Sequence, residues 1–272
     1  MLRAILFEVT AVVAMFCVAG AVTLVGPRRL EALRTELRPR LRESAPYLTV
    51  LVVVLILNSI TRDSAQDLSW QIGYEITYLL AEYDAGIVAT IQSFESQALT
   101  AYFSSVYVYG YVFVLVFPIL AYVALSDHKP FQRLVVAYSI NYFIGLTLYI
   151  LFVAYGPRNW YAIEAGAEAA KVVYENHLYG MTGSETANEL LTSEVNSRTN
   201  VFPSLHTSLS ATVALFAYKT RESYPIWLGI ATFLAVSIII STMYLGIHWA
   251  VDILFGLGLA GLSVYVADRY VE

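Results

Sequence analysis

The chain is dominated by long apolar stretches that contain almost no charged residues. The stretch PIWLGIATFLAVSIIISTMY, residues 225–244, is one of them, and it matches the roughly 20 residues that a helix needs to cross a bilayer. Charged residues make up only 14% of the 272, whereas a soluble domain carries about a quarter. So few charges cannot cover the surface of a water-soluble domain of this size. The sequence therefore predicts an all-α fold, a polytopic membrane helical bundle.

Seven segments are predicted to span the membrane. They are 5–25, 46–60, 105–125, 134–154, 203–218, 225–244 and 248–267. The second and the fifth are short, and the fifth is the least hydrophobic of the seven. The whole chain, 1–272, is predicted to be a single integral membrane domain, with N-terminal spans in 1–60 and an extracytoplasmic amphipathic segment in 61–104.

Lysine and arginine gather in three loops between these spans. The loops are GPRRLEALRTELRPRLRES (26–44), SDHKPFQR (126–133) and KTRES (219–223). With seven spans all three lie on one side, which the positive-inside rule assigns to the cytoplasm. We therefore expect a multi-pass protein of the cell membrane with its N-terminus outside. The long segments 61–104 and 155–201 then lie outside as well, and their helical periodicity predicts helices that rest against the bundle or the outer interface.

Four ionisable residues fall near one membrane level although they are far apart in the sequence. They are Arg158, His206, His248 and Asp252. Ionisable groups in membrane spans are costly and usually mark a function. His248 and Asp252 are four residues apart, which places them on one face of a helix. An aspartate there orients the imidazole and leaves its other nitrogen free as a nucleophile or base. Alternatively, the two side chains have only a structural role and satisfy each other's hydrogen-bonding groups at a helix end.

The segment FPSLHTS, 202–208, looks like the start of a helix that faces an anion. Pro203 suits the first turn, and Ser204 can cap the helix or present its hydroxyl and amide to a ligand. The free N–H groups and the positive end of a helix bind phosphate readily, and an arginine such as Arg158 can form paired bonds to phosphate oxygens. Arg198 is a second candidate for that role.

Several other side chains are predicted to be structural. Ser208 and Ser210 are expected to bond to carbonyls of their own helix, and the single Cys17 is expected to pack inside the first span. The net charge of −5 comes mainly from acidic residues in the long loops, and no block of one sign predicts binding to nucleic acid. The expected partners are therefore the lipid bilayer and a membrane-borne ligand, with no prediction of oligomeric state.

At these residues the chain resembles the type 2 phosphatidic acid phosphatase superfamily. That family's signature has three parts, K-x6-R-P, P-S-G-H and S-R-x5-H-x3-D. The segment PSLH, 203–206, is similar to the second part, and STMYLGIHWAVD, 241–252, has the serine, histidine and aspartate of the third in the right spacing. Arg158 would be the arginine of the first part. The resemblance covers roughly 100–260.

Three departures from the signature indicate a branch of the family. Leu205 stands in the glycine place, Thr242 replaces the arginine of the third part, and Leu151 occupies the lysine place of the first. This pattern is similar to the inositol phosphorylceramide synthase branch, whose wider group includes the sphingomyelin synthases. Those enzymes transfer a phospho-alcohol headgroup between lipids, and a phosphodiester needs fewer cations than a dianionic monoester. The resemblance implies a six-helix catalytic core within 105–267 and an active site near the extracytoplasmic face.

The resemblance also implies a role for each site residue. His248 would attack phosphorus and form a phosphohistidine, with Asp252 orienting it, and His206 would protonate the leaving alkoxide and then deprotonate the incoming alcohol or water. Arg158 and Ser204 would bind the phosphoryl oxygens. The implied activity is that of a membrane lipid phosphotransferase or phosphatase, acting on a phospholipid or a polyprenyl- or sphingolipid-type substrate. The scheme requires no metal and no cofactor.

Three other interpretations of the same residues stay open at this point. His206, His248 and Asp252 could form a two-histidine, one-carboxylate metal site, as in a metal-dependent membrane hydrolase. A non-enzymatic lipid transporter with histidines as a proton relay is a second alternative, although it predicts ionisable residues spread through the membrane depth. The third alternative is an intramembrane serine protease that uses Ser204 or Ser208 with His248. It gives His206 no catalytic role.

Overall fold

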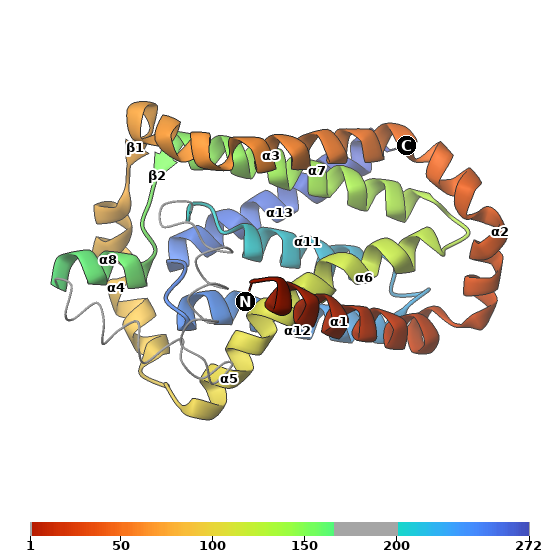
Figure 1. Cartoon of the computed structure of the whole chain (residues 1–272), viewed down its shortest axis with the longest axis horizontal. Helices are drawn as coiled ribbons and strands as arrows, with labels where there is room; N and C mark the ends of the chain where they lie inside the picture. Colours follow the sequence, from red (N-terminus) through yellow and green to blue (C-terminus); the bar gives the residue numbers. More distant parts are fainter. Residues whose placement is uncertain (1, 166–200, 272) are drawn as a thin grey trace.

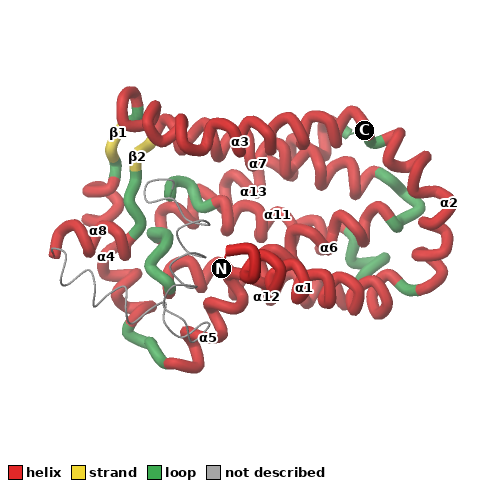
Figure 2. Tube along the Cα trace, in the orientation of Figure 1, coloured by secondary structure: helices red, strands yellow, loops and turns green. Residues whose placement is uncertain are grey.

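The computed structural model describes residues 2–165 and 201–271 of the chain (Figure 1). The helices are, in chain order, α1 (Leu2–Gly20), α2 (Pro27–Glu43), α3 (Ala45–Ile72), α4 (Thr77–Gln92), α5 (Gln97–Ser105), α6 (Tyr111–Val123), α7 (Lys129–Leu151), α8 (Pro157–Ala165), α11 (Leu205–Lys219), α12 (Pro225–Tyr244) and α13 (Ala250–Tyr270). The π-helical turns η1 (Ala21–Val25) and η2 (Val106–Gly110) continue α1 and join α5 to α6. Strands are limited to two short pieces in the described part (Figure 2). The predicted all-α membrane bundle is confirmed.

Most of the predicted spans correspond to long apolar helices. In the described part of the chain, five helical segments are long and apolar enough to cross a membrane, namely Leu6–Val25, Gln97–Val123, Lys129–Leu151, Pro225–Tyr244 and Ala250–Tyr270. A sixth results if α2 and the first part of α3, which are bent by 71° at their junction, are taken as one broken span. The third of the predicted spans thus begins earlier than expected, at Gln97, and the second belongs to the long helix α3.

The predicted span 203–218 differs most from expectation. It forms α11, a helix of 15 residues. At 1.5 Å per residue such a helix is about 22 Å long, which is shorter than the roughly 30 Å apolar layer of a bilayer. It packs against α6, α7, α12 and α13 and so lies inside the bundle. The short, less hydrophobic sequence of α11 therefore belongs to a central helix, and its beginning is placed within the protein.

Helix α2 lies across one end of the bundle, where the three basic segments meet (Figure 1). Arg40 is buried and donates hydrogen bonds to the carbonyls of Val123 and Leu125, both at 2.6 Å. Arg29 donates to the carbonyl of Ser223 at 3.1 Å. Nδ1 of His128 lies 2.8 Å from Oε2 of Glu43, so the three basic segments are close together at one end of the molecule. The five or six apolar spans found in the described part are fewer than the seven predicted.

The opposite end of the bundle is built by short elements (Figure 1). Strands β1 (Tyr74–Glu75) and β2 (Phe152–Val153) pair in parallel and tie the end of α3 to the end of α7. The predicted amphipathic segment 61–104 is divided here among the end of α3, β1, α4 and α5. The N-termini of α11 and α13 also face this end, which is where the ionisable residues singled out from the sequence come together.

Candidate active site

His248 and Asp252 come from the loop between α12 and α13 and from the first turn of α13. The amide of His248 donates to the carbonyl of Thr242 at 3.1 Å, which holds the backbone of His248 against the end of α12. Both side chains are buried, with 3% and 0% of their surface exposed. The Nδ1 atom of His248 lies 3.5 Å from Oδ2 of Asp252. The two side chains are thus close together, but not on one helix face as expected, because His248 precedes the N-cap Trp249 and only Asp252 lies in the helix.

The Asp252 carboxylate is held by the start of its own helix. Its Oδ2 accepts a hydrogen bond from the amide of Trp249 at 2.8 Å, which closes a capping box at the N-terminus of α13. Its Oδ1 has no hydrogen-bond partner among the residues that the structure describes. A carboxylate fixed by the backbone in this way can orient the imidazole of His248 without itself having to move.

The other nitrogen of His248 is also engaged. The backbone of Val201 is a hydrogen-bond partner of this imidazole. Because Nδ1 has no hydrogen-bond partner in the described part, the bond to Val201 uses Nε2. A ligand that approaches His248 from the side opposite Asp252 therefore takes the place of a backbone contact.

His206 lies in the first turn of α11, with its ring centroid 5.9 Å from that of His248. The His206 ring is held between two tyrosines, since Tyr107 stacks on it at 4.7 Å and Tyr111 contacts it at 4.3 Å. Its Nε2 is buried and has no partner among the described residues. The two imidazoles are therefore neighbours, and Nε2 of His206 can still accept a hydrogen bond from, or donate one to, a ligand.

Ser204 is the N-cap of α11. Its hydroxyl oxygen accepts a hydrogen bond from the amide of Thr207 at 3.2 Å, and its own amide donates to the carbonyl of Asp252 at 3.1 Å. Pro203 was expected in the first turn, but it precedes the cap because the helix starts at Leu205. The amide of Ser204 is thus used to join α11 to α13, and only its hydroxyl hydrogen remains for a ligand.

Arg158 is brought to the site by the first turn of α8. Its side chain is buried, its amide donates to the carbonyl of Gly246 at 2.9 Å, and its charge acts on the His248 imidazole. Two glycines permit this approach. Gly246 has a φ angle of 65°, a backbone conformation that residues other than glycine rarely adopt. A Cβ on Gly156 would lie 2.3 Å from the carbonyl oxygen of Ile247.

The predictions for two helix serines, the single cysteine and the second candidate arginine can be compared with the structure. Ser208 donates its hydroxyl to Oδ1 of Asn141 on α7 instead of bonding to its own helix, and Ser210 has no partner among the described residues. Cys17 is buried as expected. Arg198 lies outside the described residues.

Two kinds of residue near the site were missed by the sequence analysis. Asp84, on α4, is buried and accepts a hydrogen bond from the amide of Val251 at 2.6 Å, so it satisfies a second free N–H at the start of α13. The only signal in the sequence was its position among the acidic residues of the amphipathic segment. The tyrosines that hold His206 gave no signal, because aromatic residues are frequent along the whole third span.

The positions of the possible metal ligands can be compared with the two-histidine, one-carboxylate metal site considered above. In the described part of the chain, no group of three or more His, Cys, Asp or Glu side chains is placed to hold one metal ion. The two imidazoles and Asp252 form a row instead, in which the carboxylate lies behind His248.

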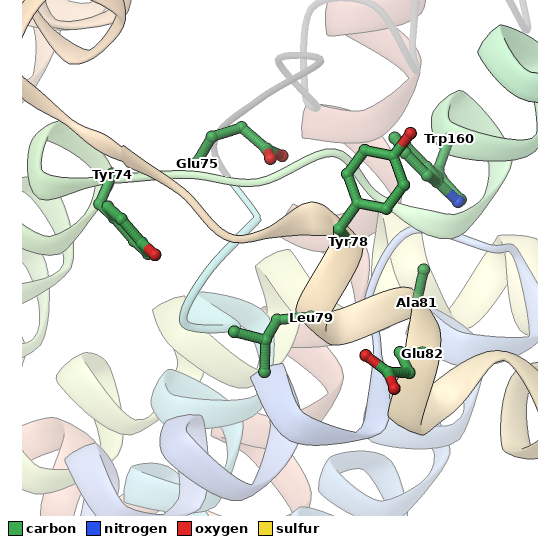
Figure 3. A pocket seen from close by; sticks show the side chains of 7 residues that line it. All are labelled: Tyr74, Glu75, Tyr78, Leu79, Ala81, Glu82 and Trp160. Atoms are coloured by element: carbon green, nitrogen blue, oxygen red, sulfur yellow. The ribbon is translucent and has the colours of Figure 1, made fainter.

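A cavity of about 560 Å³ opens at the same end of the molecule but is separate from these residues. It is lined by parts of β1, α4 and α8, and Figure 3 shows its side chains, which are Tyr74, Glu75, Tyr78, Leu79, Ala81, Glu82 and Trp160. No residue of the histidine pair lines it. The candidate active site is therefore defined by the buried side chains around the two imidazoles.

Comparison with known proteins decides the family. The family model described as the PAP2 superfamily, PAP2 being type 2 phosphatidic acid phosphatase, matches residues 84–266, which is more than half of the chain. The chain belongs to the PAP2 superfamily. All five predicted site residues lie within the matched range, and Asp84 is its first residue. No curated protein and no solved structure matches the chain. Membership in the PAP2 superfamily supports a phosphatase or phosphotransferase type of function on lipids in a bilayer.

Proposed function

We propose that this PAP2 protein is a membrane lipid phosphotransferase or phosphatase that works through a phosphohistidine intermediate. The observation that carries the proposal is the pair of buried imidazoles 5.9 Å apart, one backed by a carboxylate and the other with a free nitrogen. Reacting atoms in a productive complex are about 3–3.5 Å apart. With the centroids this close, a phosphoryl group does not fit directly between the rings, so we place the phosphorus atom beside them, in front of Nε2 of His248 and within reach of Nε2 of His206.

In the first half of the reaction, Nε2 of His248 attacks phosphorus in line with the leaving oxygen. The N–P bond forms as the P–O bond to the leaving alkoxide breaks, and His206 gives that alkoxide a proton. Asp252 stabilises the positive charge that develops on His248. The attack uses the neutral tautomer of His248 with its hydrogen on Nδ1, beside Asp252, so Nε2 gives up its hydrogen bond to the backbone of Val201 and the substrate takes that position.

In the second half, His206 acts in the opposite direction. It takes the proton from an incoming alcohol or water, whose oxygen attacks phosphorus while the N–P bond breaks. An alcohol on another lipid gives transfer of the phospho-headgroup, and water gives hydrolysis. His248 returns to its neutral state, so every proton and electron pair is accounted for by the two histidines.

The charges around the phosphoryl group favour a diester substrate. Arg158 supplies one permanent positive charge, and Ser204 and the N-terminus of α11 supply dipoles. Apolar Leu151 and neutral Thr242 stand where the family signature has cations. One cation balances the single negative charge of a phosphodiester better than the two charges of a phosphomonoester. This supports headgroup transfer of the inositol phosphorylceramide synthase type, with a phospholipid or a polyprenyl- or sphingolipid-type molecule as substrate.

The membrane orientation follows from the two ends of the bundle. The basic segments are close together at the end where α2 lies, and the N-termini of α11 and α13, beside which His206 and His248 are found, face the other end. By the positive-inside rule, we place the α2 end in the cytoplasm and the candidate active site near the extracytoplasmic face of the cell membrane.

The test is identification of products. Purified protein in detergent, with EDTA present, is incubated with isotopically labelled phospholipids with and without acceptor alcohols, and products are identified by mass spectrometry. We expect the labelled headgroup to be transferred to the acceptor or released to water, and His248→Ala to give no product. Absence of product from every phosphoester offered, or loss of activity caused by EDTA, would contradict the proposal.

A further inference from the structure

Tyr107 places a buried hydroxyl next to the candidate active site. It lies in η2, the π-helical turn between α5 and α6, and 4% of the residue is exposed. Its hydroxyl is buried and has no hydrogen-bond partner among the residues that the structure describes. Buried hydroxyl groups in proteins are almost always bonded, and one without a partner calls for an explanation.

The ring of Tyr107 lies against one of the two site histidines. It stacks on His206 with the ring centroids 4.7 Å apart and an interplanar angle of 27°, so the two rings lie face to face in nearly parallel planes. The charge of Arg158 also acts on the Tyr107 hydroxyl. The hydroxyl is therefore near the two groups that are expected to contact opposite parts of a bound phosphoryl group. Single π-turns within helices are frequent at functional sites, because they shift side chains out of the normal helical register.

Tyr111 provides an internal comparison. It contacts the same imidazole at 4.3 Å from α6, but at an interplanar angle of 42°, and its side chain is only partly buried. Its hydroxyl is not among the buried groups that lack a partner. Both tyrosines thus contact His206, and of the two only the Tyr107 hydroxyl is a fully buried group without a partner among the described residues.

We propose that the Tyr107 hydroxyl donates a hydrogen bond to a phosphoryl oxygen of the bound substrate. This inference rests on the proposed function, since it assigns one more contact to the same phosphoryl group. A neutral donor at this position stabilises the negative charge without adding a cation, which agrees with the absence of positive charge at Leu151 and Thr242. Tyr107 is then a catalytic residue that helps to select a singly charged phosphodiester.

The test compares Tyr107→Phe with the matched control Tyr111→Phe. Each variant keeps the ring that packs on His206 and removes one oxygen atom. Orthovanadate, which resembles the phosphoryl group during transfer, is titrated into the detergent-solubilised protein and binding is measured by calorimetry. We expect Tyr107→Phe to bind orthovanadate about 10- to 100-fold more weakly than the unmodified protein, the effect of one hydrogen bond to a charged group. Tyr111→Phe should change the affinity less than about threefold, within the usual scatter of such effects.

A stability measurement separates this role from a structural one. Because the hydroxyl has no partner within the described chain, its removal should leave the thermal unfolding temperature of the unliganded protein unchanged or raise it. Equal orthovanadate affinity in the unmodified protein and Tyr107→Phe would overturn the inference while leaving the proposed function intact. An unfolding temperature lowered by Tyr107→Phe would also overturn it, because the hydroxyl would then serve the fold. Failure of the unmodified protein both to bind orthovanadate and to turn over any phosphoester would overturn the proposed function as well.

Discussion

Replacement of Gly156 by alanine should damage catalysis through the backbone alone. A Cβ at this position would lie 2.3 Å from the carbonyl oxygen of Ile247, whereas ordinary contacts begin at about 3.4 Å, so the two loops must separate by about 1 Å. Gly156 directly precedes α8, whose first turn carries Arg158, and the loop of Ile247 carries His248. The separation also strains the 2.9 Å hydrogen bond from the Arg158 amide to Gly246. A misplacement of about 1 Å between reacting groups lowers rates by about 100-fold.

The assay is release of nitrophenolate from bis(4-nitrophenyl) phosphate by protein in detergent. This singly charged diester has leaving groups that need no protonation, so the rate reports chiefly on the nucleophile and its alignment. Gly258→Ala on α13 is the matched control, because a Cβ there meets no atom within 4 Å and its activity should equal that of the unmodified protein. The reasoning is refuted if Gly156→Ala keeps full activity, or if its loss of activity is matched by Gly258→Ala.

Three further predictions concern the carboxylates and the orientation. Asp252→Asn should leave the thermal unfolding temperature nearly unchanged, because the Asn side chain can still accept a hydrogen bond from the backbone. It should lower the rate of nitrophenolate release by about 10⁴, as the analogous change does in serine proteases, because Asn does not enforce the same imidazole tautomer. A rate within tenfold of normal would argue against an orienting role. Asp84→Ala should reduce the free energy of unfolding by about 1–3 kcal/mol, because the amide of Val251 loses its acceptor, whereas Asp84→Asn should reduce it less. Thermal or denaturant unfolding in detergent measures both variants. Equal reductions would count against a role for this hydrogen bond. In a cysteine-free background, single cysteines at Ser93 and Ser126 should react with a membrane-impermeant maleimide from opposite sides of sealed vesicles, and labelling of both from one side would overturn the proposed orientation.

The bundle could be predicted from the sequence because apolar length and charge placement are local properties. The spacing of four residues between His248 and Asp252 correctly indicated that the two side chains are close, although the common helix face was wrong, because His248 lies just before the N-cap of α13. Span 203–218 could not be predicted in the same way. Apolar composition suits both a helix that faces lipid and a helix at the centre of a bundle, and only the packing of α11 on four neighbours shows its central position.

Contacts between distant segments account for the parts of the site that were missed. Asp84 bonds to an amide 167 residues away, and Tyr107 reaches His206 because a π-turn changes the register of its helix. Neither effect leaves a pattern within a short window of sequence. The prediction that Pro203 lies in the first helical turn was wrong for a local reason, because the sequence alone does not assign a cap position to within one residue.

The central claim is that His248 is the nucleophile and His206 the acid and base. The most direct measurement is rapid mixing of His206→Ala and of His248→Ala with bis(4-nitrophenyl) phosphate, followed by quenching and mass analysis of the protein. With His206→Ala we predict a stoichiometric burst of nitrophenolate, slow turnover, and a nitrophenylphosphoryl group on the peptide that contains His248. With His248→Ala we predict neither burst nor adduct. A burst that persists in His248→Ala, or an adduct on any other residue, would contradict the account.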